Sequence, residues 1–242
     1  MHGIGTLCNV LAVLVGGGLG LLLKSGLSER FQSILMQACS LAVIFIGASG
    51  AMTGLLAVSD GGLTTQGSTM LVLSLVLGGL LGEALNIEHK MDILGDKLRR
   101  RFGAKDDAGF VNGFVTASLV ICIGAMAVVG AIQDGLSGDW SMLLAKSMLD
   151  FIIIMVFAST LGPGVLCSAI PVGVYQGSIT LFASFIAPYM TDAVVSGMSF
   201  IGSVLVFGVG INLLRPHSFR VGNLLPALLI PPLWELIRGL IR

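Results

Sequence analysis

Long apolar runs recur along the whole chain, and no other feature limits its fold as strongly. Eight of them stand between short polar segments, at about residues 4–23, 33–57, 68–85, 110–132, 141–162, 165–187, 194–214 and 221–237. Runs of this length match a helix that crosses the hydrocarbon core of a bilayer, and they lack the alternation typical of a membrane β-strand. We therefore predict an all-α fold, a polytopic transmembrane helix bundle of seven or eight spans that forms a single domain over residues 1–242.

Charged residues are scarce, which favours a protein surrounded by lipid. They make up 11% of the 242 residues, against 55% for hydrophobic residues, whereas soluble domains carry about 25% charged residues. The first run lacks the charged start and the cleavage site of a signal peptide, so we expect residues 4–23 to remain as the first span. Pro226, Pro231 and Pro232 interrupt the last run, so seven spans is the alternative to eight.

The distribution of Lys and Arg predicts how the chain is oriented. Ten of the 13 basic residues fall in the segments 24–32, 86–109 and 215–220, which alternate with more acidic segments. Basic loops face the cytoplasm in membrane proteins, so we expect the N-terminus to lie outside. Arg238 and Arg242 do not fit this scheme, and they weaken the prediction of an eighth span.

Clustered glycines recur in three of the runs, which indicates an internal repeat. The segments are AVLVGGGLGLLLK (12–24), SLVLGGLLGEALN (74–86) and SVLVFGVGINLLR (203–215). We interpret residues 1–58 and 68–134 as two copies of one helical hairpin, with further copies expected at 141–187 and 194–237. The alternative is that glycine-rich apolar helices align by chance. Repeats are common in transporters, where the substrate binds between them.

Four of these glycines form pairs at a spacing of four residues, Gly16 with Gly20 and Gly78 with Gly82. That spacing opens one helix face, so that a second backbone can approach closely in lipid. Gly208 takes the matching place in the third segment. We predict that these five glycines pack helices together, and the glycine-rich faces lead us to expect a homodimer.

The linker at 86–105 differs from the other polar segments because its apolar residues recur at helical spacing. They are Ile87, Met91, Leu94, Leu98 and Phe102. The pattern predicts an amphipathic helix on the cytoplasmic face of the bilayer, with Arg99, Arg100 and Arg101 near anionic head groups. Docking to a protein or a nucleic acid is the less favoured alternative, and we expect no nucleic-acid partner.

One ionisable pair falls inside an apolar run, where charges are expensive and usually functional. Asp150 lies about 14 Å along a helix that starts near Ser141, and Lys146 precedes it by one turn on the same face. We predict an ion-binding or coupling carboxylate at Asp150. The alternative is an interfacial pair whose lysine reaches outward. For Glu83, at the end of the third run, an interfacial position is the favoured interpretation and a coupling role the alternative.

The segment LGPGVLCSAIPVGVYQGS, residues 161–178, carries two prolines and four glycines within membrane depth. Proline removes a backbone donor, so we expect a broken helix here, as is typical of transporter binding sites. Tyr175, Gln176 and Ser178 follow the break. Together with Asn9 and Asp150 they are the predicted ligands of a small solute or ion. The alternative is that the uncharged residues only bridge neighbouring helices.

Enzyme and cofactor motifs are absent from the sequence. It contains no GxSxG, HExxH or phosphate-binding GxxxxGK[ST] pattern, and its Cys and His residues show no metal-ligand spacing. We therefore expect no enzymatic activity, no metal and no cofactor.

The segments GTLCNVLAVLVGGGLGLLLKSGLSERF and LMQACSLAVIFIGASGAM resemble a family of bacterial inner-membrane proteins of unknown function, that of YqgA and YdfK. GGLLGEALNIE and LLPALLIPPLWELI extend the resemblance over the full chain. It implies a multi-pass protein of the bacterial cytoplasmic membrane with about seven spans, and it assigns no binding residue. We expect a secondary transporter or channel-like permease for a small solute or ion. The alternative is a non-transporting scaffold or regulator.

Overall fold

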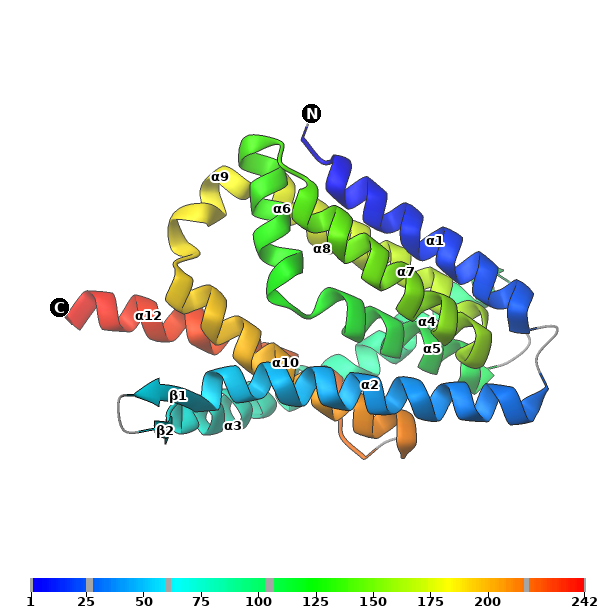
Figure 1. The fold of residues 1–242 in the computed structure, drawn as a ribbon, viewed down its shortest axis with the longest axis horizontal. Helices are drawn as coiled ribbons and strands as arrows, with labels where there is room; N and C mark the ends of the chain where they lie inside the picture. Colours follow the sequence, from blue (N-terminus) through cyan, green and yellow to red (C-terminus); the bar gives the residue numbers. More distant parts are fainter. Residues whose placement is uncertain (1, 25–27, 60–61, 103–106, 216–217, 242) are drawn as a thin grey trace.

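The computed structural model describes residues 2–24, 28–59, 62–102, 107–215 and 218–241, and helices dominate it (Figure 1). The long helices are α1 (Ile4–Lys24), α2 (Glu29–Leu55), α3 (Ser68–Leu85), α7 (Ser141–Leu161) and α10 (Asp192–Leu214). Each consists largely of apolar residues that need no polar partner in lipid, while the helix satisfies the backbone hydrogen bonds. The predicted all-α membrane bundle is confirmed.

Six helices in the described part of the chain are long and apolar enough to cross a membrane. A seventh span results if α5 (Asp107–Cys122) and α6 (Ala125–Ser137), which meet at an angle of 63°, are counted as one. We expected a single span over 110–132, and the structure divides it into these two helices. The reason lies at Gly124, whose φ of 146° and ψ of 149° cannot belong to a helix.

The end of the chain forms short helical pieces in place of an eighth full span. They are α11 (Val221–Leu224), the 3-10 helix η3 (Leu225–Leu229) and α12 (Ile230–Ile241). The apolar part, Val221–Ile237, is shorter than the helices that pass as spans. The prolines of this segment fall where one piece gives way to the next, which agrees with the alternative of seven spans. Arg242 lies outside the described residues.

The break that we predicted within 161–178 lies at the end of a span, not in its middle. Gly162, with a φ of 90°, ends α7, and the 3-10 helix η1 (Pro163–Ser168) leads directly into α8 (Ala169–Leu181). Pro163 and Pro171 both stand in the first turn of a helical segment, where the missing N–H costs little. The prediction of a broken helix at membrane depth is therefore wrong for this segment.

The helices pack in pairs whose members are far apart in sequence. Figure 1 shows α1 along α7 and α2 along α10. In the first pair, a Cβ on Gly16 or Gly20 would collide with the backbone of Phe151 or Met155. In the second, Gly47 lies against the backbone of Phe207. Since these contacts involve main-chain atoms, only glycine allows them.

The second predicted glycine pair makes the same kind of contact. Gly78 lies against the backbone of Ala227 and Gly82 against that of Asn223, so α3 packs closely on η3 and α11. Gly208 differs, because a Cβ there would meet Val221 at an ordinary 3.4 Å. Gly210, two residues on, makes the close approach instead. The faces of the two glycine pairs are thus occupied within the chain, and they no longer support the expected homodimer, which stays a prediction.

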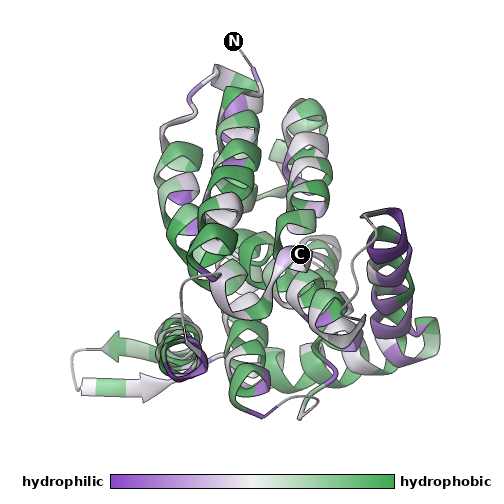
Figure 2. Ribbon diagram, turned by 90° about the vertical axis from the view of Figure 1, so that its right-hand side faces the viewer, coloured by the Kyte–Doolittle hydropathy of each residue, from purple (hydrophilic) through white to green (hydrophobic). Residues whose placement is uncertain are grey.

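The predicted linker helix is α4 (Ile87–Phe102), the purple helix in Figure 2. Its apolar face packs mainly on the protein: Met91 contacts the main core, and Leu98 contacts the cluster around Phe114 on α5. Leu94 remains 47% exposed. Residues 103–105 of the predicted linker and the Phe102 side chain lie outside the described residues. Much of the face that we assigned to lipid is therefore covered by α5.

Short elements complete the fold on the loops between the spans. An antiparallel hairpin of β1 (Leu56–Ser59) and β2 (Gly62–Thr65), which the sequence analysis did not predict, connects α2 to α3. The short helices α9 (Ala183–Ile186) and η2 (Ala187–Tyr189) connect α8 to α10. The main core brings together apolar residues of α1, α2, α5, α7, α8 and α10. In contrast, α2 and α3 each bury only 17% of their most apolar stretch, so most of their surface is available to lipid.

Candidate functional site

An ion pair lies in the middle of the helix bundle. Lys146 and Asp150, one turn apart on α7, are only 6% and 4% exposed, and their side chains form a direct hydrogen-bonded salt bridge. Asp150 stands about 14 Å from the start of α7 at 1.5 Å per residue. The pair therefore lies near the centre of a span, and the alternative of an interfacial pair with an outward-reaching lysine does not fit its burial.

The break between α5 and α6 supplies the pair with a further partner. Because α5 ends at Cys122, its last carbonyl groups have no N–H donor from a following turn. One of them, that of Ile121, accepts a hydrogen bond from Lys146 Nζ at 2.8 Å. The C-terminal end of a helix also carries a partial negative charge. The open carbonyl of the broken span and the buried ammonium of Lys146 thus satisfy each other's hydrogen-bonding capacity.

Two buried amides extend this cluster toward α1 and α8. Asn9 and Gln176 are both 0% exposed, and Asn9 Nδ2 donates to Gln176 Oε1 at 3.1 Å. The Asn9 side chain also lies beside the Asp150 carboxylate. Asn9 Oδ1 and Gln176 Nε2 have no partner among the described residues. An acceptor and a donor are therefore left free beside the ion pair, in a place where unpaired polar atoms are costly.

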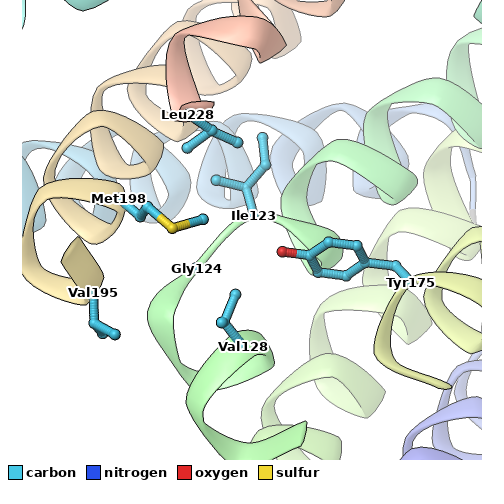
Figure 3. A pocket seen from close by; sticks show the side chains of 7 residues that line it. All are labelled: Ile123, Gly124, Val128, Tyr175, Val195, Met198 and Leu228. Atoms are coloured by element: carbon cyan, nitrogen blue, oxygen red, sulfur yellow. The ribbon is translucent and has the colours of Figure 1, made fainter. Parts of the chain in front are cut away.

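The remaining predicted ligands lie apart from the cluster. The Tyr175 ring points at a small cavity of about 20 Å³, enough for one water molecule, beside Ile123 and Gly124 at the helix break (Figure 3). Ser178 is exposed, and its hydroxyl donates to the Tyr175 carbonyl at 2.8 Å. Of the five predicted ligands, the structure brings together Asp150, Asn9 and Gln176. Tyr175 lies next to the helix break, and Ser178 faces away.

Sequence reasoning missed the Ile121 carbonyl and the role of Asp134. Asp134 Oδ1 and Oδ2 accept hydrogen bonds from Gly3 N at 3.1 Å and Gly5 N at 3.0 Å, which caps the first turn of α1. The side chain is fully buried. The span predicted at 110–132 ends two residues before this aspartate, which put it in a loop between spans. Glycine at 124 in an apolar run was the only signal of the break at Ile121, and nothing near Asp134 predicted a contact with α1.

A polar network fixes the corner between α3, α4 and α11. Glu83 accepts hydrogen bonds from Arg220 and from Asn223, each at 2.7 Å, and the Asn223 amide accepts one from the backbone N–H of Glu88. Glu88 in turn accepts a hydrogen bond from Gly222 N at 3.0 Å. Burial raises the pKa of Glu88 above its usual range, and the hydrogen bond from Gly222 partly opposes this rise. Glu83 is 58% exposed at its side chain, which agrees with the interfacial interpretation.

Metal chemistry has no obvious place in the described residues. They include no group of three or more His, Cys, Asp and Glu side chains that could hold a metal ion. The buried cluster offers one carboxylate, one ammonium, two amides and a backbone carbonyl. Such a set can bind a small polar solute or a singly charged ion.

Comparison with known proteins places the chain in a family. Residues 4–236 match the family described as "Protein of unknown function (DUF554)". The chain belongs to this family. It is 32% identical over 228 residues to "Uncharacterized membrane protein YdfK" of Bacillus subtilis (strain 168), covering 94% of this chain and 93% of the relative. It is 33% identical over 231 residues to "Uncharacterized protein YqgA" of Escherichia coli (strain K12), covering 94% of both.

The match confirms the resemblance seen in the sequence. No solved structure matches the chain. One DUF554 relative is named a membrane protein, which agrees with the apolar helices described above. Since neither relative's name states an activity, the function has to be inferred from the buried cluster.

Proposed function

We propose that this DUF554 protein is a secondary transporter or channel-like permease for a small solute or ion. It would lie in the bacterial cytoplasmic membrane with its N-terminus outside, and it would have no enzymatic activity. Asp150 and Lys146 would form the coupling site, with Asn9 and Gln176 beside them. The helix break near Gly124, in place of the segment 161–178, would be the discontinuous element of the site.

The observation that carries this proposal is the buried ion pair against the end of a broken helix. Charged side chains at membrane depth cost several kcal/mol each unless they are paired. A pair that only held helices together could be replaced by apolar residues at little cost. A broken span whose carbonyl faces a charge is a recurring feature of transporter sites. The free polar atoms of Asn9 and Gln176 add a place where a solute could bind.

A second candidate, a non-transporting scaffold or regulator, is favoured by the close packing of the bundle. The cavity beside Tyr175 has a volume of only 20 Å³, and it is lined mainly by apolar side chains. In a transporter, this packing would correspond to a closed conformation. In a scaffold, it would be the only conformation. A homodimer remains part of either proposal, with the exposed apolar faces of α2 and α3 available for it.

Flux measurements on reconstituted protein separate the two candidates. Purified protein in liposomes is assayed for uptake of amino acids, organic acids and monovalent ions. Asp150→Asn is expected to abolish flux. Asp139→Asn, a matched change at an exposed carboxylate before α7, should transport like the wild type. If folded wild-type protein moves none of these solutes, or if Asp150→Asn transports normally, the transporter proposal is wrong and the scaffold is favoured.

A further inference from the structure

The ammonium group of Lys146 sits where a free cation would bind. Its two hydrogen-bond acceptors, Asp150 Oδ2 and the Ile121 carbonyl, come from different helices and converge on Nζ. A carboxylate and a carbonyl from an interrupted helix are the oxygen ligands that transporters use for small monovalent ions. The Lys146 side chain comes from the preceding turn of α7. Its ammonium group therefore fills, as part of the chain itself, a site that is lined by oxygen atoms.

We propose that Asp150 and the Ile121 carbonyl form a binding site for one monovalent cation, and that the ammonium of Lys146 competes with this cation. The inference rests on the proposed function in one respect, because it names the ion that the transporter would couple or carry. Its test below measures binding and needs no flux. Cation binding at this site can therefore be absent although another solute is transported, and a cation can bind there although no transport is observed.

Charge balance determines what must happen when a cation enters. One carboxylate neutralises one positive charge, and a second, uncompensated charge at this depth is strongly unfavourable. A cation M⁺ therefore binds to Asp150 when Lys146 gives one proton to water and remains as a neutral amine. One proton leaves for each cation that enters, so the exchange carries no net charge.

The groups that face the pair support a site of this charge. On α5, the Cys122 thiol is near enough to interact with both Lys146 and Asp150. The other buried aspartate of the described residues, Asp134 on α6, is already bound by backbone N–H groups of Gly3 and Gly5. The neighbouring polar side chains on α1 and α8, Asn9 and Gln176, are neutral. Because Asp150 is the single carboxylate in this cluster of described residues, a divalent ion would lack the charge that it needs.

The first experiment removes the lysine side chain and tests whether a small alkylammonium ion binds in its place. Lys146→Ala should destabilise the detergent-purified protein, because Asp150 is left buried without a partner. Methylammonium, ethylammonium or propylammonium should then raise the unfolding midpoint, with a further rise for each tenfold increase in concentration. Tetramethylammonium, which has no N–H donor, controls for ionic strength and should have no effect. Lys146→Met fills the space of the stem and should not respond to any of these ions.

The second experiment uses the wild-type protein, so it does not depend on whether Lys146→Ala folds. Binding of Li⁺, Na⁺, K⁺ and ammonium is measured by calorimetry from pH 6 to 9, and proton release is followed in weak buffer. Competition with one proton predicts that the apparent Kd of at least one ion falls about tenfold per pH unit. Cys122→Ala should retain this dependence, and Asp150→Asn should lose the binding.

Each result bears on the proposal. It is supported if a cation binds to the wild type and releases one proton per ion, and rescue of Lys146→Ala with small alkylammonium ions adds independent support. It is overturned if none of the four inorganic ions binds between pH 6 and 9, or if binding releases no proton. It is also overturned if a folded Lys146→Ala variant responds equally to tetramethylammonium and ethylammonium, or if binding survives in Asp150→Asn.

Discussion

Lys146 Nζ donates a hydrogen bond to the carbonyl oxygen of Ile121, 2.8 Å away on the helix that ends one residue later. This contact ties α7 to the break between α5 and α6, and Lys146 links it to Asp150, which lies beside Asn9 of α1. A change at any of these points is expected to act on the others, because the acceptors and donors are shared.

Removal of either member of the ion pair should destabilise the protein more than removal of both. Lys146→Met or Asp150→Leu leaves one buried charge unpaired and is expected to lower the free energy of unfolding by about 3–5 kcal/mol. The double variant replaces the pair with apolar side chains and should lose much less. Unfolding by SDS titration in mixed micelles measures all four proteins. Additive effects of the two changes would contradict a direct pairing.

Two neighbouring glycines of α1 should respond in opposite directions to alanine. A Cβ at Gly20 would collide with the backbone of Met155 on α7, whereas a Cβ at Gly18 has no atom within 4 Å. Gly20→Ala is expected to destabilise the protein by about 1–3 kcal/mol through overpacking. Gly18→Ala should be neutral or stabilising by up to about 1 kcal/mol, because alanine favours a helix. The same SDS titration applies, and equal effects at both positions would argue against the close contact of α1 with α7.

Replacement of Gly124 should destabilise the protein, and the backbone conformation at this position should be the sole cause. Its φ of 146° and ψ of 149° lie in a region that only glycine adopts readily. Since a Cβ there would meet no atom within 4 Å, a loss of stability cannot come from a clash. Gly124→Ala is expected to cost about 1–3 kcal/mol. Gly177→Ala, within α8 and in ordinary contact only, serves as the control and should retain wild-type stability.

Glu88 should make the stability of the α3–α4 corner depend on pH. Burial raises its pKa in the folded protein above the ordinary 4.5, so protonation favours the folded state. The contribution of this group is fully present below pH 4.5 and is lost as the pH rises through the raised folded pKa. Thermal unfolding of wild type and Glu88→Gln is compared from pH 4 to 7. The wild type should gain stability relative to the variant as the pH falls.

Asp139 provides a comparison of opposite sign. Hydrogen bonds from the Ser141 hydroxyl and backbone N–H hold the pKa of this exposed carboxyl below the ordinary 3.8. Its contribution is therefore present above pH 3.8 and is lost as the pH falls through the lower folded value. The wild type should lose stability relative to Asp139→Asn below pH 4. If Glu88→Gln and Asp139→Asn shift in the same direction, the assignment for Glu88 is wrong.

The sequence predicted the spans well because length and hydropathy are local properties. It predicted the position of helix breaks poorly, because a break depends on what surrounds it. Pro163 and Pro171 were expected to interrupt a helix, yet they occupy first turns, where proline fits. The true break follows Cys122, in a run with three glycines and no proline, and it is stabilised by a lysine on another helix.

The candidate site could be predicted in part for a similar reason. A charge or an amide in an apolar run is visible in the sequence, so Asp150, Asn9 and Gln176 were found. Their partners were less visible, since Asn9 and Gln176 are 167 residues apart. The side of a helix on which Ser178 would lie depended on the packing of α8, which the sequence pattern did not determine. Whether the four expected hairpin copies share an origin stays a prediction.

The pairing of α1 with α7 and of α2 with α10 also bears on how the protein is made. Gly16 and Gly20 leave the ribosome roughly 135 residues before Phe151 and Met155, which corresponds to about 7–27 s of translation. During that interval the first two helices lie in the bilayer with their glycine faces against lipid. Their hydropathies of 2.1 and 1.9 allow each to remain inserted alone. Assembly of the bundle is therefore a late event in biosynthesis, and its timing is set by the arrival of the second half of the chain.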